Sequence, residues 1–146
     1  MSKSILMITP VALELEPDGK PITADWVLSG TPVSRTANLA RSHDWTSKSL
    51  VWECTAGLFN WFYTEDESLV VISGEAFIMN GKGEERRLGP GDFAFFPAGS
   101  SCTWRVPHLV RKVAIVRETM WRPLGFCLKV WKKLLRLTGI AGKSQL

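Results

Sequence analysis

Short apolar runs separated by glycine-rich turns fill the middle of the chain, between residues 49 and 117. The runs are rich in Val, Ile, Phe and Trp, and the turns Asn80–Gly83 and Gly89–Asp92 contain residues that tolerate positive φ. Because no helical period lies between the runs, the pattern predicts an all-β antiparallel sandwich or barrel. The expected strands are 50–55, 58–64, 69–73, 75–80, 84–88, 92–96, 100–106 and 110–117.

Two stripes of side chains are expected to face the interior of this barrel, because side chains alternate along a strand with a period of two. They are Phe59, Trp61 and Tyr63 in the first stripe, and Cys102, Trp104 and Val106 in the second. The chain has seven Trp and seven Phe but one Tyr, and so many large rings favour either an aromatic core or an aromatic ligand pocket.

The residues before this region are less regular. Prolines at positions 10, 21 and 32 interrupt any long helix, and short extended pieces such as Trp26–Leu28 suit the edge of a sheet. We therefore expect residues 1–48 to form an N-terminal arm with edge strands, joined to a barrel formed by residues 49–117.

Apolar residues return at helical spacing in the last segment, residues 118–146. Pro123 suits the start of a helix, and Gly139 or Gly142 suits its end. The apolar face contains Leu124, Leu128, Trp131 and Leu135, and the opposite face contains Lys129, Lys132, Lys133 and Arg136. The pattern predicts a basic, amphipathic C-terminal helix.

The net charge of +4 is unevenly distributed along the chain. Residues 1–116 contain 11 basic and 13 acidic residues and sum to −2, whereas residues 117–146 contain seven basic residues and only Glu118, and sum to +6. The basic character therefore belongs to the tail, and no nucleic-acid partner is expected. The helix within residues 121–146 could bind a membrane surface, but we favour packing of its apolar face on the barrel or on a second subunit.

A length of 146 residues favours one structural domain with a core of its own. The three cysteines form an odd set without CxxC spacing, which favours a reducing, cytoplasmic location over a disulfide framework. The first residues are too short an apolar stretch for a signal peptide, and no run is long enough to span a membrane.

Several spaced motifs occur together between Trp52 and Lys112. They are Trp61-Phe62-Tyr63, Asp66-Glu67, Ile72-Ser73-Gly74-Glu75, Gly89-Pro90-Gly91-Asp92, Phe96-Pro97-Ala98-Gly99 and Trp104-Arg105-Val106. This segment resembles the cupin superfamily (RmlC-like), and in detail the small cupins grouped with ureidoglycine aminohydrolase and ethanolamine-utilisation cupins. The resemblance implies a jelly-roll barrel of six to eight strands.

The same resemblance places four metal-ligand positions on this chain. Counting back from Glu67, the two histidine positions of the first motif fall on Tyr63 and Trp61, and the histidine position of the second motif falls on Cys102. Only Glu67 is of the usual ligand type, and an indole ring cannot bind a metal. We therefore expect no metal and no other cofactor, with a non-standard set of Tyr63, Glu67 and Cys102 as the alternative.

These residues lead to a ligand-binding hypothesis with an enzymatic alternative. The barrel is expected to bind a small metabolite through Trp61, Tyr63, Glu67, Cys102 and Trp104. By analogy with ureidoglycine aminohydrolase, the alternative is a small enzyme acting on a nitrogenous metabolite, with Glu67 as catalytic acid or base. Glu67 could instead simply hydrogen-bond a neighbouring strand or Tyr63, and the rings could simply fill the barrel.

Two further expectations concern charge and assembly. Arg105, Arg111 and Lys112 recur near strand ends, where one of them could face the barrel mouth and bind a carboxylate or amide. A homodimer is expected because exposed edges of such barrels are commonly paired between subunits. A purely structural subunit, with the tail as its interface, is the third hypothesis.

Overall fold

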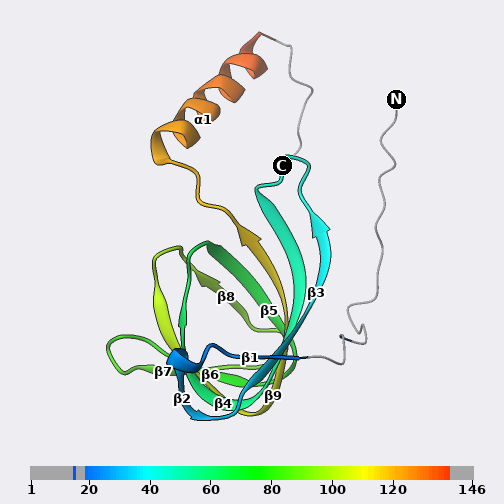
Figure 1. Cartoon of the computed structure of the whole chain (residues 1–146). Helices are drawn as coiled ribbons and strands as arrows, with labels where there is room; N and C mark the ends of the chain where they lie inside the picture. The colour runs from blue at the N-terminus through cyan, green and yellow to red at the C-terminus, as the bar shows by residue number, and fades with distance from the viewer. Residues whose placement is uncertain (1–14, 16–18, 139–146) are drawn as a thin grey trace.

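A computed structural model of the chain describes residue 15 and residues 19–138. Nine strands in this part form one antiparallel sheet that curls into a barrel, and a helix follows the last strand (Figure 1). The strands are β1 Lys20–Pro21, β2 Val27–Gly30, β3 Val33–Arg41, β4 Ser47–Phe62, β5 Asp66–Gly74, β6 Ala76–Met79, β7 Glu85–Leu88, β8 Phe93–Phe96 and β9 Ser101–Arg117. The short 3-10 helix η1 is Ala24–Trp26 and the α-helix α1 is Arg122–Leu137. The predicted all-β jelly roll with a C-terminal helix is confirmed.

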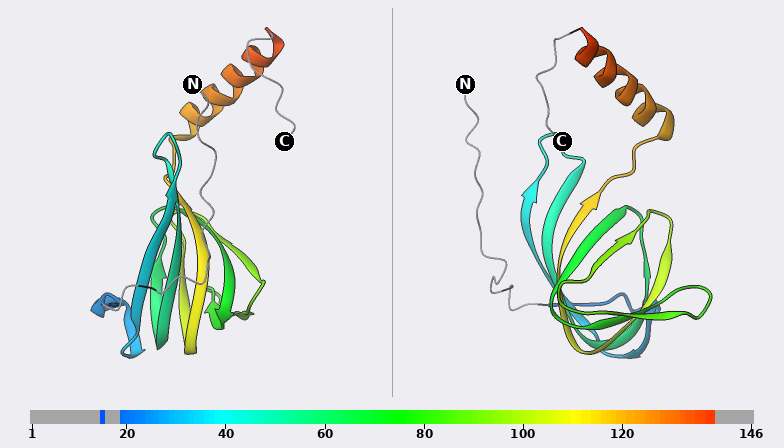
Figure 2. Two further views of the ribbon diagram at one scale, coloured as in Figure 1. Left: turned by 90° about the vertical axis from the view of Figure 1, so that its right-hand side faces the viewer. Right: turned by 180° about the vertical axis from the view of Figure 1, so that it is seen from behind.

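Two long strands, β4 and β9, form the spine of the sheet. They pair along almost their whole length, and both bend where Thr55 and Gly57 face Leu109 and Val106 across a shift in register. The first half of β4 pairs with β3, and the second half pairs with β2. Likewise β9 pairs with β6 before the bend and with β5 after it. One bend therefore folds a single sheet into two facing halves (Figure 2).

The sequence prediction was wrong at this bend. It divided β4 into strands 50–55 and 58–64, and divided β9 into strands 100–106 and 110–117, whereas each pair is one bulged strand. A bulge and a strand end look alike in the sequence, because both interrupt the alternation and accept glycine or proline. At Gly57 the glycine is required for packing, since a Cβ there would lie 2.7 Å from Cβ of Pro32.

The arm before the barrel contributes more pairing than short edge strands. Strand β3 extends the sheet with a nine-residue strand that pairs with β4 from Ser34 to Arg41. The predicted piece at Trp26–Leu28 lies at the end of η1 and in β2, which ends at Gly30. The arm's other predicted features before residue 19, apart from residue 15, lie outside the described residues, as do Gly139 and Gly142.

Alternation along the strands places the core inside the barrel. The core cluster contains Phe59 and Trp104 together with the inward residues Leu69, Val71 and Val110. Phe59 and Trp104 belong to the two stripes that were predicted to face inward, and Leu69, Val71 and Val110 follow the same period of two on their own strands.

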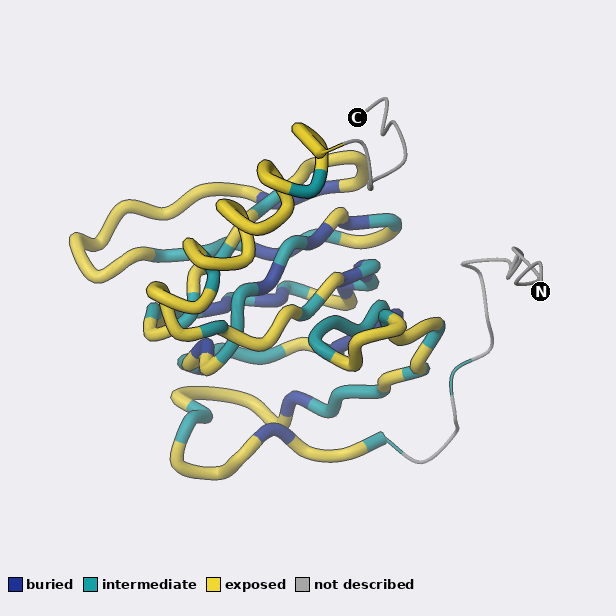
Figure 3. Tube along the Cα trace, turned by 90° about the horizontal axis from the view of Figure 1, so that it is seen from above, coloured by how far each residue is buried: buried dark blue, intermediate teal, exposed yellow. Residues whose placement is uncertain are grey.

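Helix α1 stands apart from this core. It begins with Pro123 in its first turn, and none of its residues is buried (Figure 3). The expectation that it packs on the barrel of its own chain is therefore not met, while packing on a second subunit stays a prediction. None of the described helical segments combines the length and the apolar character that crossing a bilayer would need.

Candidate functional site

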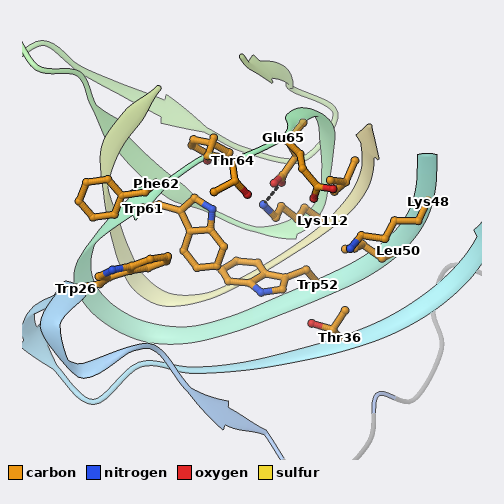
Figure 4. A pocket seen from close by; sticks show the side chains of 13 residues that line it. Trp26, Thr36, Lys48, Leu50, Trp52, Trp61, Phe62, Thr64, Glu65 and Lys112 are labelled. Atoms are coloured by element: carbon orange, nitrogen blue, oxygen red, sulfur yellow. Dashed lines mark hydrogen bonds and ion pairs between the residues drawn. The ribbon is translucent and has the colours of Figure 1, made fainter. Parts of the chain in front are cut away.

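A pocket of about 290 Å³ opens between β3, β4, β9 and the loop that follows β4. Its wall is aromatic, since Trp26, Trp52, Trp61, Phe62 and Tyr63 all line it. Trp26, Trp61 and Trp52 follow one another in this order along the wall toward the polar floor (Figure 4). Their centroids lie 5.4 Å (Trp26 to Trp61) and 5.7 Å (Trp61 to Trp52) apart in edge-to-face contacts, an arrangement that aromatic pairs favour.

A buried ion pair forms the floor of the pocket. The Lys112 ammonium donates a hydrogen bond of 2.5 Å to Oε1 of Glu67, and the two residues are 3% and 8% exposed. The same ammonium lies 4.6 Å from the centroid of Trp52 and 4.8 Å from that of Trp104. The cation is thus held by one carboxylate and two aromatic faces.

Strand alternation and register bring these groups together. Lys112 pairs directly with Trp52 of β4 on one side and with Val71 of β5 on the other. It faces inward because its neighbours at a spacing of two, Val110 and Ala114, are fully buried core residues. Burial lowers the pKa of Lys112 below the usual 10.5, although the negative charge of Glu67 acts in the opposite direction.

Tyr63 lies beside the pair in a second cluster of hydrogen-bonded and stacked side chains. Its ring stacks on Phe96 with centroids 4.5 Å apart, and its hydroxyl accepts a 3.1 Å hydrogen bond from Nε1 of Trp104. Sγ of Cys102 contacts the same hydroxyl at 3.9 Å. Burial raises the pKa of Tyr63 and of Cys102 above their usual values, so both side chains stay protonated near neutral pH.

The five residues predicted to bind a ligand fall into two groups. Trp61, Tyr63 and Glu67 line the pocket. Trp104 and Cys102 lie behind Tyr63 and do not line it; Cys102 borders a different, smaller hollow beside the β6–β7 turn. The second pair therefore supports the wall and would not touch a molecule bound in this pocket.

Sequence reasoning missed the main polar partner of the site. Lys112 was one of three cations expected near strand ends, and nothing singled it out as the partner of Glu67. The signal was available, because Lys112 occupies an inward position in the alternating run from Val110 to Val116. Trp26 and Trp52 were also missed as lining residues, since only register and the position of η1 bring them to the wall.

Of the other two cations, Arg111 and Arg105 lie away from the pocket. Nε of Arg111 donates to Glu53 at 3.1 Å, and Nη2 of Arg105 pairs with Glu85 at 2.6 Å near the β6–β7 hairpin. Neither residue lines the pocket. Lys112 alone among the three cations faces the interior.

An antiparallel sheet of this topology, folded around a side-chain-lined pocket, defines a β-barrel of the cupin class. The chain belongs to the family of EutQ-like cupin domains, whose family model matches residues 41–114, just over half of the 146 residues. No curated protein is significantly similar to the sequence.

Solved structures agree with this fold. EutQ from Clostridium difficile is 24% identical with a TM-score of 0.53, over 62% of this chain and 71% of that chain. A DUF861-family protein of unknown function from Pseudomonas syringae pv. tomato is 24% identical with a TM-score of 0.66, over 73% of this chain and 46% of that one. An ethanolamine utilization protein, EutQ, from Salmonella typhimurium LT2 is 19% identical with a TM-score of 0.55, over 73% of this chain and 99% of that one. At these identities the likeness concerns the fold alone.

The residues at the cupin ligand positions do not fit a metal ion. Glu67 is already bound by the Lys112 ammonium, and burial raises the pKa of Tyr63 and of Cys102, so a metal ion would have to displace a proton from each of them before it could bind there. The two histidines, His43 and His108, are exposed and do not line the pocket. Within residues 19–138, no three His, Cys, Asp or Glu side chains gather in a metal-binding arrangement. The ammonium of Lys112 lies beside the carboxylate that the family pattern gives to a metal.

Proposed function

We propose that this barrel binds a small, uncharged or zwitterionic organic molecule, using its own side chains in place of a metal. The proposal rests on one observation: a buried Glu67–Lys112 pair forms the floor of a pocket whose wall is aromatic. Aromatic rings bind the apolar or planar body of such a molecule, and a few placed polar groups orient it.

The polar groups of the pocket indicate the chemistry of the ligand. Among the described residues, hydrogen bonds use only Oε1 of Glu67, which leaves Oε2 as an acceptor for an N–H or O–H group of a ligand. Lys48 and Lys112 contribute two positive charges to the lining, and Glu65 and Glu67 contribute two negative charges, so the sum is zero. A molecule with strong net charge would meet no net opposite charge here, whereas a planar amide or ureide fits the donor and acceptor pattern.

Binding can be tested by tryptophan fluorescence, because three Trp rings line the pocket. Nicotinamide is a suitable planar amide probe, allantoin a suitable ureide, and benzoate a charged comparison. We expect saturable binding of at least one of the two neutral probes and none of benzoate. Replacing Glu67 with Gln should weaken binding about 10- to 100-fold, because a hydrogen bond to a charged acceptor is worth about 1.5–3 kcal/mol.

A matched pair of tryptophan variants separates the pocket from the rest of the molecule. Trp61→Ala removes a lining ring and should abolish the probe signal, while Trp45→Ala removes an indole that is 70% exposed outside the pocket and should leave it unchanged. Near-ultraviolet circular dichroism shows whether each variant keeps its fold. If neither probe saturates, and native mass spectrometry finds no co-purifying small molecule, the binding proposal fails.

A catalytic role is the second candidate, and the short Glu67–Lys112 hydrogen bond favours it. This bond places a proton donor and a proton acceptor side by side on the pocket floor, and burial lowers the pKa of Lys112 below its usual value. Lys112→Arg would retain the positive charge but could not release a proton at moderate pH. If the protein turns over a ureide or amide, this variant should bind the substrate but lose the turnover; equal loss of both would assign Lys112 to binding alone.

A further inference from the structure

Helix α1 presents an apolar face that the barrel does not cover. None of its residues is buried, and its large side chains Phe126, Trp131 and Leu137 are 69%, 60% and 75% exposed. Trp121, directly before the helix, is also exposed. Exposed rings and leucines gathered on one element mark an interaction surface.

Charge and apolar residues are fully separated around this helix. Its five charged residues are all basic: Arg122, Lys129, Lys132, Lys133 and Arg136. At about 100° per residue, these five fall within an arc of about 100°. Every Leu, Val, Phe and Trp of the helix lies outside that arc. A helix with one cationic face and one broad apolar face is suited to lie flat in an interface between water and lipid.

The helix turns much of its polar side toward the barrel and most of its apolar side away. Lys129 and Lys132 border a wide hollow between α1 and the end of the barrel, together with Phe126 and Leu128 at the edges of the apolar face. Asp44 and Asp66 border the hollow from the other side. Trp131 does not border this hollow. In the views of Figures 1 and 2, the helix stands off the barrel beyond the end of β9. Its apolar face is therefore free to meet a flat surface.

We propose that α1 binds the surface of an anionic lipid bilayer, with its apolar face in the headgroup boundary. The charge of the helix favours this occupant over a second copy of the chain. Its five cations have no acidic residue on the same helix, and the ion pairs found among the described residues do not involve α1. Residues 1–116 sum to only −2, which is little negative charge for a basic helix of a second copy to bind. Anionic headgroups supply that charge at high density, and Trp and Phe side chains suit the interface.

Co-sedimentation of the full chain with vesicles tests this proposal. Vesicles of phosphatidylcholine with about a quarter phosphatidylglycerol supply anionic charge, and vesicles of phosphatidylcholine alone do not. We expect the protein to sediment with the anionic vesicles, to bind the neutral ones much more weakly, and to be released as salt rises. Failure of the wild-type chain to bind anionic vesicles at low salt would overturn the proposal.

Two variants of α1 and a control elsewhere make the test specific. Trp131→Glu introduces a charge into the apolar face and should abolish sedimentation. Lys132→Gln with Lys133→Gln should weaken partition about 30-fold, because each basic residue near an anionic surface contributes about 1 kcal/mol. The control removes two exposed cations from the β6–β7 hairpin, Lys82→Gln with Arg86→Gln, and should bind as the wild type does.

Two results would contradict the lipid assignment even if sedimentation occurs. Equal weakening by the hairpin control would show non-specific adhesion of a basic protein. If Trp131→Glu dissociates an oligomer in analytical ultracentrifugation but leaves vesicle binding unchanged, the apolar face binds a second copy of the chain. Thermal unfolding checks that every variant is as stable as the wild type, which we expect because the substituted positions are exposed.

Discussion

Lys112 is the residue on which the account of the site depends most. A lysine that is almost fully buried must have a partner, because an unpaired charge in a barrel interior is strongly unfavourable. Here the partner is Glu67, and the faces of Trp52 and Trp104 complete the surroundings of the ammonium. Each charge therefore keeps the other in the interior.

Removing one member of this pair should destabilise the fold. We expect Lys112→Met to lower the free energy of unfolding by about 3–5 kcal/mol, because it leaves Glu67 buried without a partner. The double variant Lys112→Met with Glu67→Met should recover most of that loss, since it removes both charges. Urea denaturation measures both.

The matched control is the exposed pair of Arg105 and Glu85, whose nitrogen and oxygen atoms lie 2.6 Å apart. Arg105→Met should unfold at nearly the wild-type urea concentration, because solvent screens this pair. If Lys112→Met were equally harmless, the ion pair could not be the structural centre of the pocket.

The cysteines should differ sharply in reactivity. Burial raises the pKa of Cys54 to about 12 and also raises that of Cys102, whereas Cys127 is exposed on α1. A raised thiol pKa means less of the reactive thiolate at a given pH, so the buried thiols should react slowly. We expect a disulfide reagent to label Cys127 rapidly in the folded protein, and all three cysteines only in denaturant. Rapid labelling of Cys102 would instead indicate a reactive thiol behind the wall of the pocket.

At the residue scale, the sequence predicted which residues line the pocket better than it predicted which residues contact one another. Glu67, Tyr63 and Trp61 line the pocket because strand alternation is visible in sequence, and they stay predicted ligand residues until binding is measured. The partner of Glu67 could not be found from alternation alone. Pairing of Lys112 with Trp52 and Val71 is set by the register of three strands, and register is a long-range property.

At the scale of the elements, the long strands depend on glycine at their junctions. Gly74, at the end of β5, has φ of +70°, and a Cβ there would overlap the carbonyl oxygen of Leu109. Gly91, in the turn before β8, has φ of +86° with open space around it. A side chain at position 91 would therefore add backbone strain alone, whereas a side chain at position 74 would add both strain and steric overlap.

We expect Gly91→Ala to destabilise the protein by about 1–2 kcal/mol, which is the ordinary strain of a left-handed alanine. Gly74→Ala should destabilise the protein by about 3 kcal/mol or more. The backbone at residue 74 becomes strained, and β9 must also move away from the new Cβ. Thermal unfolding of the two variants measures the difference. Equal destabilisation would show that β5 and β9 do not approach closely at this point.

The elements also show why the strand boundaries were predicted less well than the fold class. Turns such as Asn80–Gly83 are local, and the predicted hairpin between β6 and β7 is present. The bend of β4 and β9 at Gly57 and Val106 is not local, because two strands far apart in sequence must bulge opposite each other. For this reason, β4 and β9 were each predicted as two strands.

At the scale of the whole molecule, helix α1 contributes no buried residue to the core of the barrel. No residue of α1 is buried, although the chain between β9 and the helix is short. The outer face of the sheet has its own apolar residues, with Val70, Phe93, Phe95 and Ile115 all exposed. The predicted homodimer stays a prediction, and this face offers it one apolar surface apart from α1.

A chain that lacks residues 121–146 should therefore keep a folded barrel. We expect its midpoint of thermal unfolding to lie within about 3 °C of the full chain, because little apolar surface of the barrel becomes exposed. Differential scanning calorimetry provides the measurement. Aggregation of the shortened chain, or a much lower midpoint, would mean that α1 covers the core.

The most direct test of the central account is the metal content of the purified chain after equilibration with Mn²⁺, Fe²⁺, Ni²⁺ or Zn²⁺. Because an ammonium already binds Glu67, and a metal ion would have to displace protons from Tyr63 and Cys102 against their raised pKa values, we expect well under about 0.1 ion per chain by mass spectrometry after dialysis. About one tightly held ion per chain, lost in Glu67→Gln, would contradict the account and place a metal where the structure places Lys112.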